Sequence, residues 1–438
     1  METKQTSLTP LKAVDRIQSI DIMRGIVLFG ILLMNINGMA LANAYGDPTV
    51  SGGATGWNLY TWIATNMLFE GTMRALFSLL FGAGMFILLN RLEKKGAGIK
   101  AADIYFRRLM WLLLFGLIHA YLILWTGEIL FAYSLMGFLV YTFRNMQPKK
   151  LIIIALVLLS FGTLWNYADY EENAKFIKNV SIAEQFKSEG KPLTDELKTA
   201  QIKWEELQKE RSPEAITEYN SNMQKEYFSV VAFLAPINIY YGKLYSYRYD
   251  VWDILSMMLL GIAFFKLNIL SSEKPYAFYF LMATFGYLVG LTTNYFEIAY
   301  IMKQNFSWLS FSKTNITYDL GRVAVAIGHV GLIMLFCKST ILSQLKKALG
   351  AVGKMALTNY IMHSVIALFI FTGAGFGLFG AFQRHELLYI VFAIWIFQLI
   401  ASPIWLKYYY FGPLEWLWRN LSYQKRHPLK KKNWAQKK

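Results

Sequence analysis

Long apolar runs separated by short polar stretches dominate the pattern of hydrophobic and polar positions along the chain. A helix needs about 20 apolar residues to cross the hydrocarbon core of a bilayer. Windows that meet or approach this length predict ten membrane-spanning helices, at residues 22–43, 72–90, 109–125, 128–143, 151–167, 251–270, 275–295, 321–337, 353–373 and 388–408. We therefore expect an all-α, polytopic membrane protein.

One long polar stretch, residues 168–226, divides the predicted helices into two groups of five. It holds 9 basic and 13 acidic residues, and residues 195–210 within it combine helix formers with Glu and Lys at pairing distances. The predicted organisation is a first five-helix half (1–167), an extracytoplasmic helical insertion (168–226), a second five-helix half (227–408), and an interfacial segment with a basic tail (409–438).

Two weaker patterns also bear on the topology. The apolar segment 228–241 has only 14 residues and contains Pro236, so we interpret it as interfacial or re-entrant. Residues 79–89 and 258–268 are faintly similar to each other. Duplicated halves would explain this similarity, and membrane composition alone would also produce it.

Composition supports a membrane protein, and the charge distribution sets its orientation. Hydrophobic residues make up 55% of the chain and charged residues 16%, with a formal net charge of +16. Outside residues 168–226, 28 of the 35 basic residues fall in cytoplasmic segments if the N-terminus is inside. We therefore predict that both termini are cytoplasmic, that the basic tail binds anionic membrane lipid, and that no nucleic acid is a partner. The single cysteine, Cys337, excludes an intrachain disulfide framework, and we expect no metal site.

Charged residues gather directly before the first apolar run. Asp21 and Arg24 are spaced i, i+3 and are expected to form an ion pair, with Arg16 about one turn further from the membrane. Arginine presents a planar set of donors that suits phosphate or carboxylate. The alternative is positive-inside anchoring, which explains a basic residue better than it explains an embedded aspartate.

These residues carry a resemblance to a known family. The run R-x4-D-x2-RG-x4-GI from Arg16 to Ile31 resembles the opening of the bacterial YeiB-like membrane proteins, a domain of unknown function. Similar segments occur along nearly the entire chain, at residues 69–84, 107–130, 353–364 and 412–419. The resemblance extends to the transmembrane acyltransferases, and it implies a cytoplasmic acyl-CoA-type donor, a glycan or lipid acceptor across the membrane, and no covalently bound cofactor. It also implies a location in the bacterial cytoplasmic membrane.

A second polar group joins His119 and Glu128, which lie on either side of the turn Trp125-Thr126-Gly127. Such a tight hairpin brings the two helix ends together. A histidine held by a carboxylate is able to act as a general base, and ionisable groups at membrane depth commonly mark a site. The alternative is a buried histidine that only stabilises the hairpin.

Further polar residues complete the predicted site. Glu70 and Arg74 are spaced i, i+4 at the outer entrance of their helix, whereas the similar pair Asp319 and Arg322 is interpreted as structural, as is His329. Within an acyltransferase we assign His119 as base, Glu128 as its orienting carboxylate and Asn35 as a donor to the reacting carbonyl. The donor would bind at Arg16, Asp21, Arg24 and Lys354, and the acceptor pocket would contain Glu70, Arg74, Asn359 and His363.

Two other functions compete with this hypothesis. Buried polar side chains between two five-helix groups would equally line the path of a small solute, as in a transporter or permease. A structural or regulatory membrane protein is the third alternative. The sequence does not predict the acyl group, the acceptor or the oligomeric state.

Overall fold

The computed structural model describes residues 17–431, except for the side chains of residues 243–247. Arg16, the first residue of the predicted donor site, lies outside these residues. Within the described range the chain is all-helical, as predicted, and its one β-type pairing is an isolated bridge between Tyr409 and Lys430.

The helices follow one another in this order: α1 (Gln18–Ala40), α2 (Gly56–Leu68), α3 (Thr72–Lys94), α4 (Ile99–Tyr121), α5 (Leu130–Val140), η2 (Tyr141–Phe143), α6 (Pro148–Ser188), α7 (Asp195–Glu210), α8 (Pro213–Met223), α9 (Tyr227–Arg248), η3 (Val251–Leu255), α10 (Ser256–Lys266), α11 (Tyr276–Lys303), α12 (Trp308–Lys338), α13 (Ser343–Lys354), α14 (Ala356–Phe371), α15 (Leu387–Tyr408) and α16 (Pro413–Tyr423).

Six helical segments of the described chain are long and apolar enough to cross a membrane: Gln18–Ala40, Gly56–Lys94, Pro148–Ser188, Tyr276–Lys303, Trp308–Lys338 and Leu387–Tyr408. The pair α13 and α14 passes the same test together, but it is bent by 81°. The predicted span 128–143 corresponds to the shorter apolar helix Leu130–Phe143. The chain is therefore a multi-pass membrane protein by length and composition, while the full count of ten spans stays a prediction.

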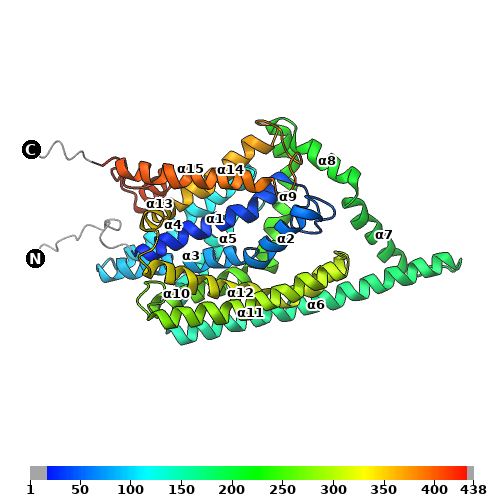
Figure 1. Cartoon of the computed structure of the whole chain (residues 1–438), viewed down its shortest axis with the longest axis horizontal. Coiled ribbons are helices and arrows are strands. Elements are labelled where there is room, and N and C mark those ends of the chain that lie inside the picture. Colours follow the sequence, from blue (N-terminus) through cyan, green and yellow to red (C-terminus); the bar gives the residue numbers. More distant parts are fainter. Residues whose placement is uncertain (1–16, 432–438) are drawn as a thin grey trace, which may run out of the picture.

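The long helices lie side by side, and α1 begins at the same end of the molecule at which α16 ends (Figure 1). Helix α1 is central and packs against α3, α13, α14 and α15. Helices α6 and α11 are peripheral and expose large apolar side chains, including Val157, Leu164, Phe285 and Phe296. Such apolar surfaces suit a lipid environment rather than water.

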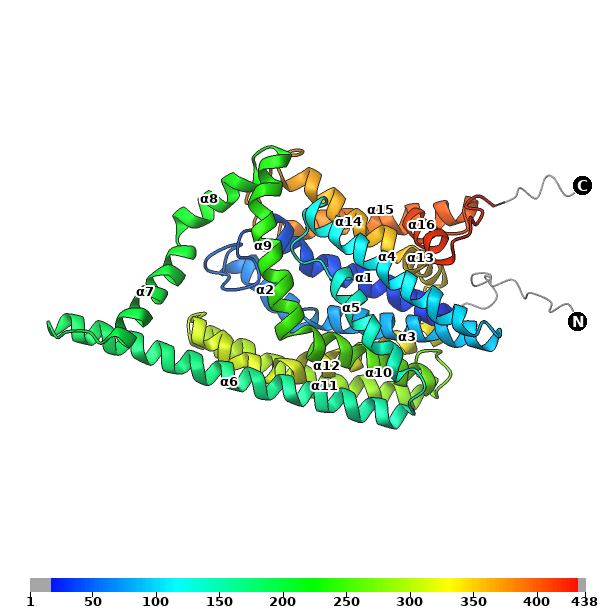
Figure 2. The same cartoon turned by 180° about the vertical axis from the view of Figure 1, so that it is seen from behind.

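The polar stretch 168–226 forms an arm outside the packed helices. Helix α6 has 41 residues, so at about 1.5 Å per residue it extends far beyond the hydrocarbon thickness of a bilayer. Figure 2 shows α7 and α8 returning from its far end towards α9. The helix predicted at 195–210 is observed as α7 (Asp195–Glu210), and Thr194 caps its start. Helix α9, which contains the segment 228–241, runs across the long helices (Figure 2).

Glycines permit close contact between α3 and α10, the helices that contain the two faintly similar segments. A Cβ added at Gly82 would lie 2.6 Å from the Met258 Cα, and one added at Gly261 would lie 2.7 Å from the Leu79 carbonyl carbon. The contact is reciprocal. Gly82, three residues after Leu79, faces the backbone of Met258, and Gly261, three residues after Met258, faces the backbone of Leu79.

Replacing Gly82 with alanine should lower the free energy of unfolding by about 1–3 kcal/mol, because backbone atoms of α10 cannot move aside for the new methyl group. The midpoint of thermal unfolding in detergent measures this effect. The matched control is Gly242→Ala in α9, where an added Cβ meets nothing within 4 Å. Equal midpoints for the two variants would show that α3 and α10 are not in this close contact.

Candidate functional site

The imidazole of His119 lies between two polar partners from two other helices. His119 is near the end of α4 and is fully buried. Its Nε2 is 2.8 Å from the Oγ of Ser364 in α14, and its Nδ1 is 3.5 Å from the Glu128 Oε1, just before α5. The structure thus brings His119 and Glu128 together, as expected from the hairpin, and adds a hydroxyl that sequence reasoning missed.

Local backbone interactions hold the hairpin in this shape. The Trp125 N–H donates to the His119 carbonyl at 3.2 Å. The Glu128 carboxylate accepts the backbone N–H groups of Leu130 and Phe131, so it caps the first turn of α5. The carboxylate keeps lone pairs that face the His119 Nδ1, which has no hydrogen-bond partner of good geometry among the described residues. A Cβ at Gly116 would lie 2.8 Å from the Glu128 Oε2, so a glycine is what lets α4 approach this turn.

Tyr360 and Ser364 share one face of α14, at i, i+4 spacing, and both face His119. The ring of Tyr360 meets the His119 ring edge-on, with centroids 5.1 Å apart. In the sequence, this i, i+4 pair of polar residues was the one feature that could have indicated Ser364 as a site residue. Its pairing with His119 depends on a contact between residues 245 positions apart, which spacing alone does not reveal.

Asn359 and His363, predicted for the acceptor pocket, bond to α15 instead. The His363 Nε2 is 3.0 Å from the Gln398 Oε1, and the Asn359 amide donates to the Ser402 hydroxyl at 3.1 Å. The Gln398 amide donates to the Asn359 carbonyl. These bonds connect α14 to α15, as polar side chains commonly do between membrane helices.

Glu70 and Arg74 belong to a different group, which we call the ionic cluster: Glu70, Arg74, Asp253, Tyr318, Asp319 and Arg322. The Asp253 carboxylate bridges Arg74 at 2.5 Å and Arg322 at 2.6 Å. Arg322 also pairs with Asp319 at 2.8 Å, and the Glu70 side chain hydrogen-bonds Tyr318. The four residues predicted as one acceptor pocket therefore take part in two separate networks. Sequence reasoning missed Asp253, which lies in the π-helical segment Val251–Leu255.

At the opposite end of the bundle from the arm, Arg24 pairs with Asp21 at 3.4 Å. Lys354 is exposed at the end of α13. The neighbouring glycines have a packing role, because a Cβ at Gly25 would strike the Leu349 carbonyl of α13 and one at Gly353 would strike the Asp21 carbonyl.

Two residues of this end were not predicted. The Arg108 guanidinium lies 3.5 Å from the ring centroid of Trp418, whose indole N–H donates to the Arg108 carbonyl. The Glu415 carboxylate accepts the N–H groups of Leu357 and Thr358 and so caps α14 just after its bend. Burial raises the pKa of Glu415, and its hydrogen bonds with Thr358 partly oppose this.

Asn35 lies partly buried on α1, and within the described chain no bond connects it to His119. Its neighbour Asn37 bonds to another segment of the chain, because its Oδ1 accepts a bond of 3.2 Å from the buried Arg384. Arg384 also donates to the carbonyls of Ala44 and Ser51, which fixes the loop after α1. Burial lowers the pKa of Arg384 to about 10.

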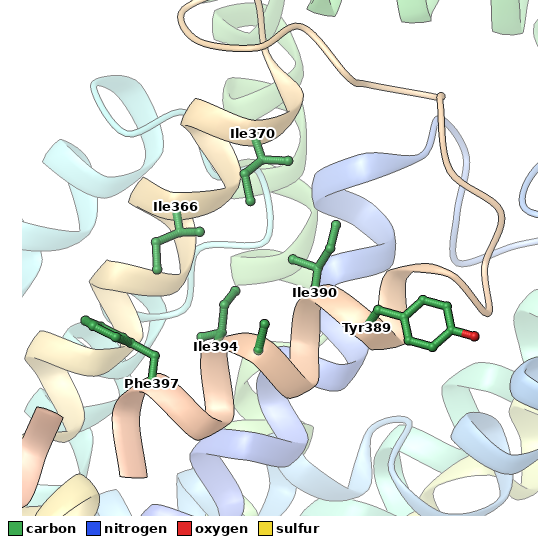
Figure 3. A pocket seen from close by; sticks show the side chains of 7 residues that line it. Ile366, Ile370, Tyr389, Ile390, Ile394 and Phe397 are labelled. Atoms are coloured by element: carbon green, nitrogen blue, oxygen red, sulfur yellow. The ribbon is translucent and has the colours of Figure 1, made fainter. Parts of the chain in front are cut away.

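A groove between α14 and α15 is apolar and separate from His119. It is lined by Ile366, Ile370, Tyr389, Ile390, Ala393, Ile394 and Phe397. Figure 3 shows the Tyr389 hydroxyl pointing away from these aliphatic side chains. The groove therefore lacks the polar groups that would orient a polar substrate. Among the described residues, no group of three or more His, Cys, Asp or Glu side chains is placed to hold a metal ion.

Fold and site together define a helical multi-pass membrane protein with polar networks buried between its helices. The family described as "Protein of unknown function (DUF418)" matches residues 264–425. "Uncharacterized protein YxaH" of Bacillus subtilis (strain 168) is 28% identical over 98% of this chain and 99% of its own length. "Uncharacterized protein YeiB" of Escherichia coli (strain K12) is 28% identical over 93% of this chain and 96% of its own. The resemblance to the YeiB-like proteins is therefore confirmed, and no solved structure matches the chain.

Proposed function

We propose that the chain is a transmembrane acyltransferase that moves an acyl group from a cytoplasmic acyl-CoA-type donor to an extracytoplasmic or lipid-linked acceptor. The observation that carries the proposal is the buried His119, held between the hydroxyl of Ser364 and the carboxylate of Glu128. Acyl transfer to a hydroxyl or amine needs a base that removes its proton, and a histidine is the side chain most often used.

The position of Glu128 supports this role for His119. When imidazole takes up a proton, the positive charge develops 3.5 Å from the Glu128 Oε1 in a water-poor environment. The carboxylate is itself fixed by two backbone N–H groups. It would therefore stabilise imidazolium without having to reorganise during the reaction.

The other end of the bundle has the chemistry to hold the donor. Arg24 offers a planar set of donors to a phosphate, and Arg108 lies nearby with its guanidinium stacked on Trp418. Lys354 is exposed and available to a negatively charged group. Asn35 was predicted to donate a hydrogen bond to the reacting carbonyl. Because no bond connects it to His119 among the described residues, it has no role in this proposal.

For the topology we propose ten spans in a bacterial cytoplasmic membrane, with both termini cytoplasmic and the arm (168–226), which contains the end of α6 together with α7 and α8, outside. Single cysteines in a Cys337→Ser background test this orientation. In right-side-out vesicles, a membrane-impermeant maleimide should label Ser188→Cys in the arm, whereas Lys100→Cys in the first turn of α4 should react only after permeabilisation. Both positions are exposed in the structure. The reverse pattern would contradict the orientation, and external labelling of both would contradict the number of spans between them.

The proposed activity is tested by mass spectrometry of small molecules that copurify with the protein from its native membrane. We expect an acyl thioester or an acylated product. The transporter hypothesis rests on the buried ionic cluster, because ionisable groups at membrane depth also mark solute and proton paths. A copurified solute with no acyl group, taken up by proteoliposomes, would favour transport over acyl transfer.

A further inference from the structure

Ser364 has the surroundings of an activated nucleophile. Its side chain is buried on α14 and its Oγ lies 2.8 Å from the His119 Nε2. The other ring nitrogen of His119, Nδ1, is 3.5 Å from the Glu128 Oε1 and has no hydrogen-bond partner of good geometry among the described residues, so this carboxylate is placed to accept from it after a small shift. A serine beside a histidine that is in turn oriented by a carboxylate is the arrangement that activates a hydroxyl for covalent catalysis, and it is recognised by geometry rather than by order in the sequence. The simpler alternative is a hydrogen bond that only joins α4 to α14.

Two buried donors next to this group add to its likeness to a reactive site. The Trp125 indole N–H interacts with the Tyr360 oxygen, and among the described residues neither the indole N–H nor the Tyr360 hydroxyl has a further hydrogen-bond acceptor of good geometry. Tyr360 is one turn before Ser364 and contacts the His119 ring, while the Trp125 backbone is bonded to His119. Leaving buried donors unpaired costs about 1–3 kcal/mol each. Such donors are what a negatively charged oxygen requires in the transition state of acyl transfer.

We propose that Ser364 is the nucleophile that carries the acyl group between donor and acceptor. The Ser364 Oγ attacks the thioester carbonyl while its proton passes to the His119 Nε2. The C–S bond then breaks, the thiolate takes the proton from His119, and an acyl ester remains on Ser364. The acceptor hydroxyl next loses its proton to His119 and attacks the carbonyl carbon of this ester. The bond between that carbon and the Ser364 Oγ then breaks, the acylated acceptor leaves, and the Ser364 Oγ recovers the proton from His119. Tyr360 and Trp125 donate to the carbonyl oxygen in both steps. This mechanism rests on the proposed acyl transfer.

The position of Ser364 along α14 suits a carrier. Helix α14 begins at Ala356, at the end where Glu415 caps it, and Ser364 follows eight residues later. At about 1.5 Å per residue, that is about 12 Å along the axis. Ser364 is therefore inside the bundle, away from Arg24 and Lys354 at the end. A covalent intermediate removes the need for donor and acceptor to meet in one complex.

An alkyl fluorophosphonate, which reacts with activated serines, tests the nucleophile without knowledge of the natural substrate. In the purified full-length protein, we expect mass spectrometry to find the label on Ser364. Labelling should disappear in Ser364→Ala and fall at least 100-fold in His119→Gln. It should persist in Ser402→Ala and His329→Gln, which change a buried serine and a partly buried histidine bonded elsewhere. Absence of label from the wild type, or equal labelling of His119→Gln, would overturn the proposal.

Two further measurements separate this inference from the proposed function. If Ser364→Ala transfers acyl groups at the wild-type rate while His119→Gln does not, Ser364 is not the carrier but acyl transfer stands. If Ser364→Ala does not fold, Ser364→Cys in the Cys337→Ser background replaces it. Its thiol should react with N-ethylmaleimide at a rate that depends on His119, and a rate unchanged by His119→Gln would contradict activation by that histidine.

Discussion

Replacing His119 with glutamine should reduce the rate of acyl transfer by about 100- to 10,000-fold, the range by which a positioned general base accelerates a reaction. Glutamine keeps a polar group of similar reach and is able to bond to the Ser364 hydroxyl, but it does not take up a proton. The packing of α4 against α14 is therefore maintained while the chemistry is lost. The rate is measured as thiol released from acyl-CoA by protein in liposomes that contain a cell-envelope extract as acceptor.

His329→Gln is the control for this experiment. His329 is partly buried and also bonded at Nε2, but its partner is the carbonyl of Leu68 at the end of α2. We expect it to retain activity within a few-fold of the wild type. If the two variants lost activity equally, or if His119→Gln remained fully active, His119 would have no special place in the mechanism.

Replacing Asp253 with asparagine should lower the free energy of unfolding by about 3–5 kcal/mol, as expected when one partner of a buried ion pair is removed. Asp253 bridges Arg74 of α3 and Arg322 of α12 within 2.6 Å of each, and both it and Arg322 are buried. Asparagine is neutral and is unable to compensate these two guanidinium groups in a low-dielectric environment. Unfolding of the purified protein in mixed micelles with increasing denaturing detergent measures the change.

The exposed pair Asp103 and Arg107 provides the comparison. It is an i, i+4 pair at 2.7 Å in which the Asp103 side chain is 53% exposed. Asp103→Asn should change stability by less than about 1 kcal/mol, because exposed ion pairs contribute little. A change as small as this in Asp253→Asn would mean that the ionic cluster does not stabilise the fold.

The sequence was sufficient for most helices because a continuous apolar run of membrane length is a local property. It was insufficient where tertiary contacts set the geometry. The run 353–373 contains the break between α13 and α14 at Met355, where Gly353 packs on Asp21 and Glu415 caps the new helix start. Apolar content rises at this point, from the amphipathic α13 to the apolar α14, which marks the start of an apolar run but gives no indication of the 81° bend.

In the candidate site, too, local contacts could be predicted from the sequence and contacts between distant helices could not. His119 and Glu128 could be predicted as neighbours because a short turn separates them, whereas Ser364 reaches His119 only through the packing of α14 on α4. Glu70 and Arg74 were expected to share a pocket with Asn359 and His363, and the structure places the two pairs in different polar networks. Each of these side chains found a partner on a helix that spacing does not identify: Asp253 or Tyr318 for the first two, Ser402 or Gln398 for the others.

The most direct test of acyl transfer at a buried His119 is a paired measurement on proteoliposomes, in which thiol release from acyl-CoA and appearance of acylated product are followed together. We expect equal amounts of free thiol and acylated envelope product, and we expect both to be lost in His119→Gln. Movement of a solute across the vesicle membrane with neither thiol release nor acylated product would contradict acyl transfer.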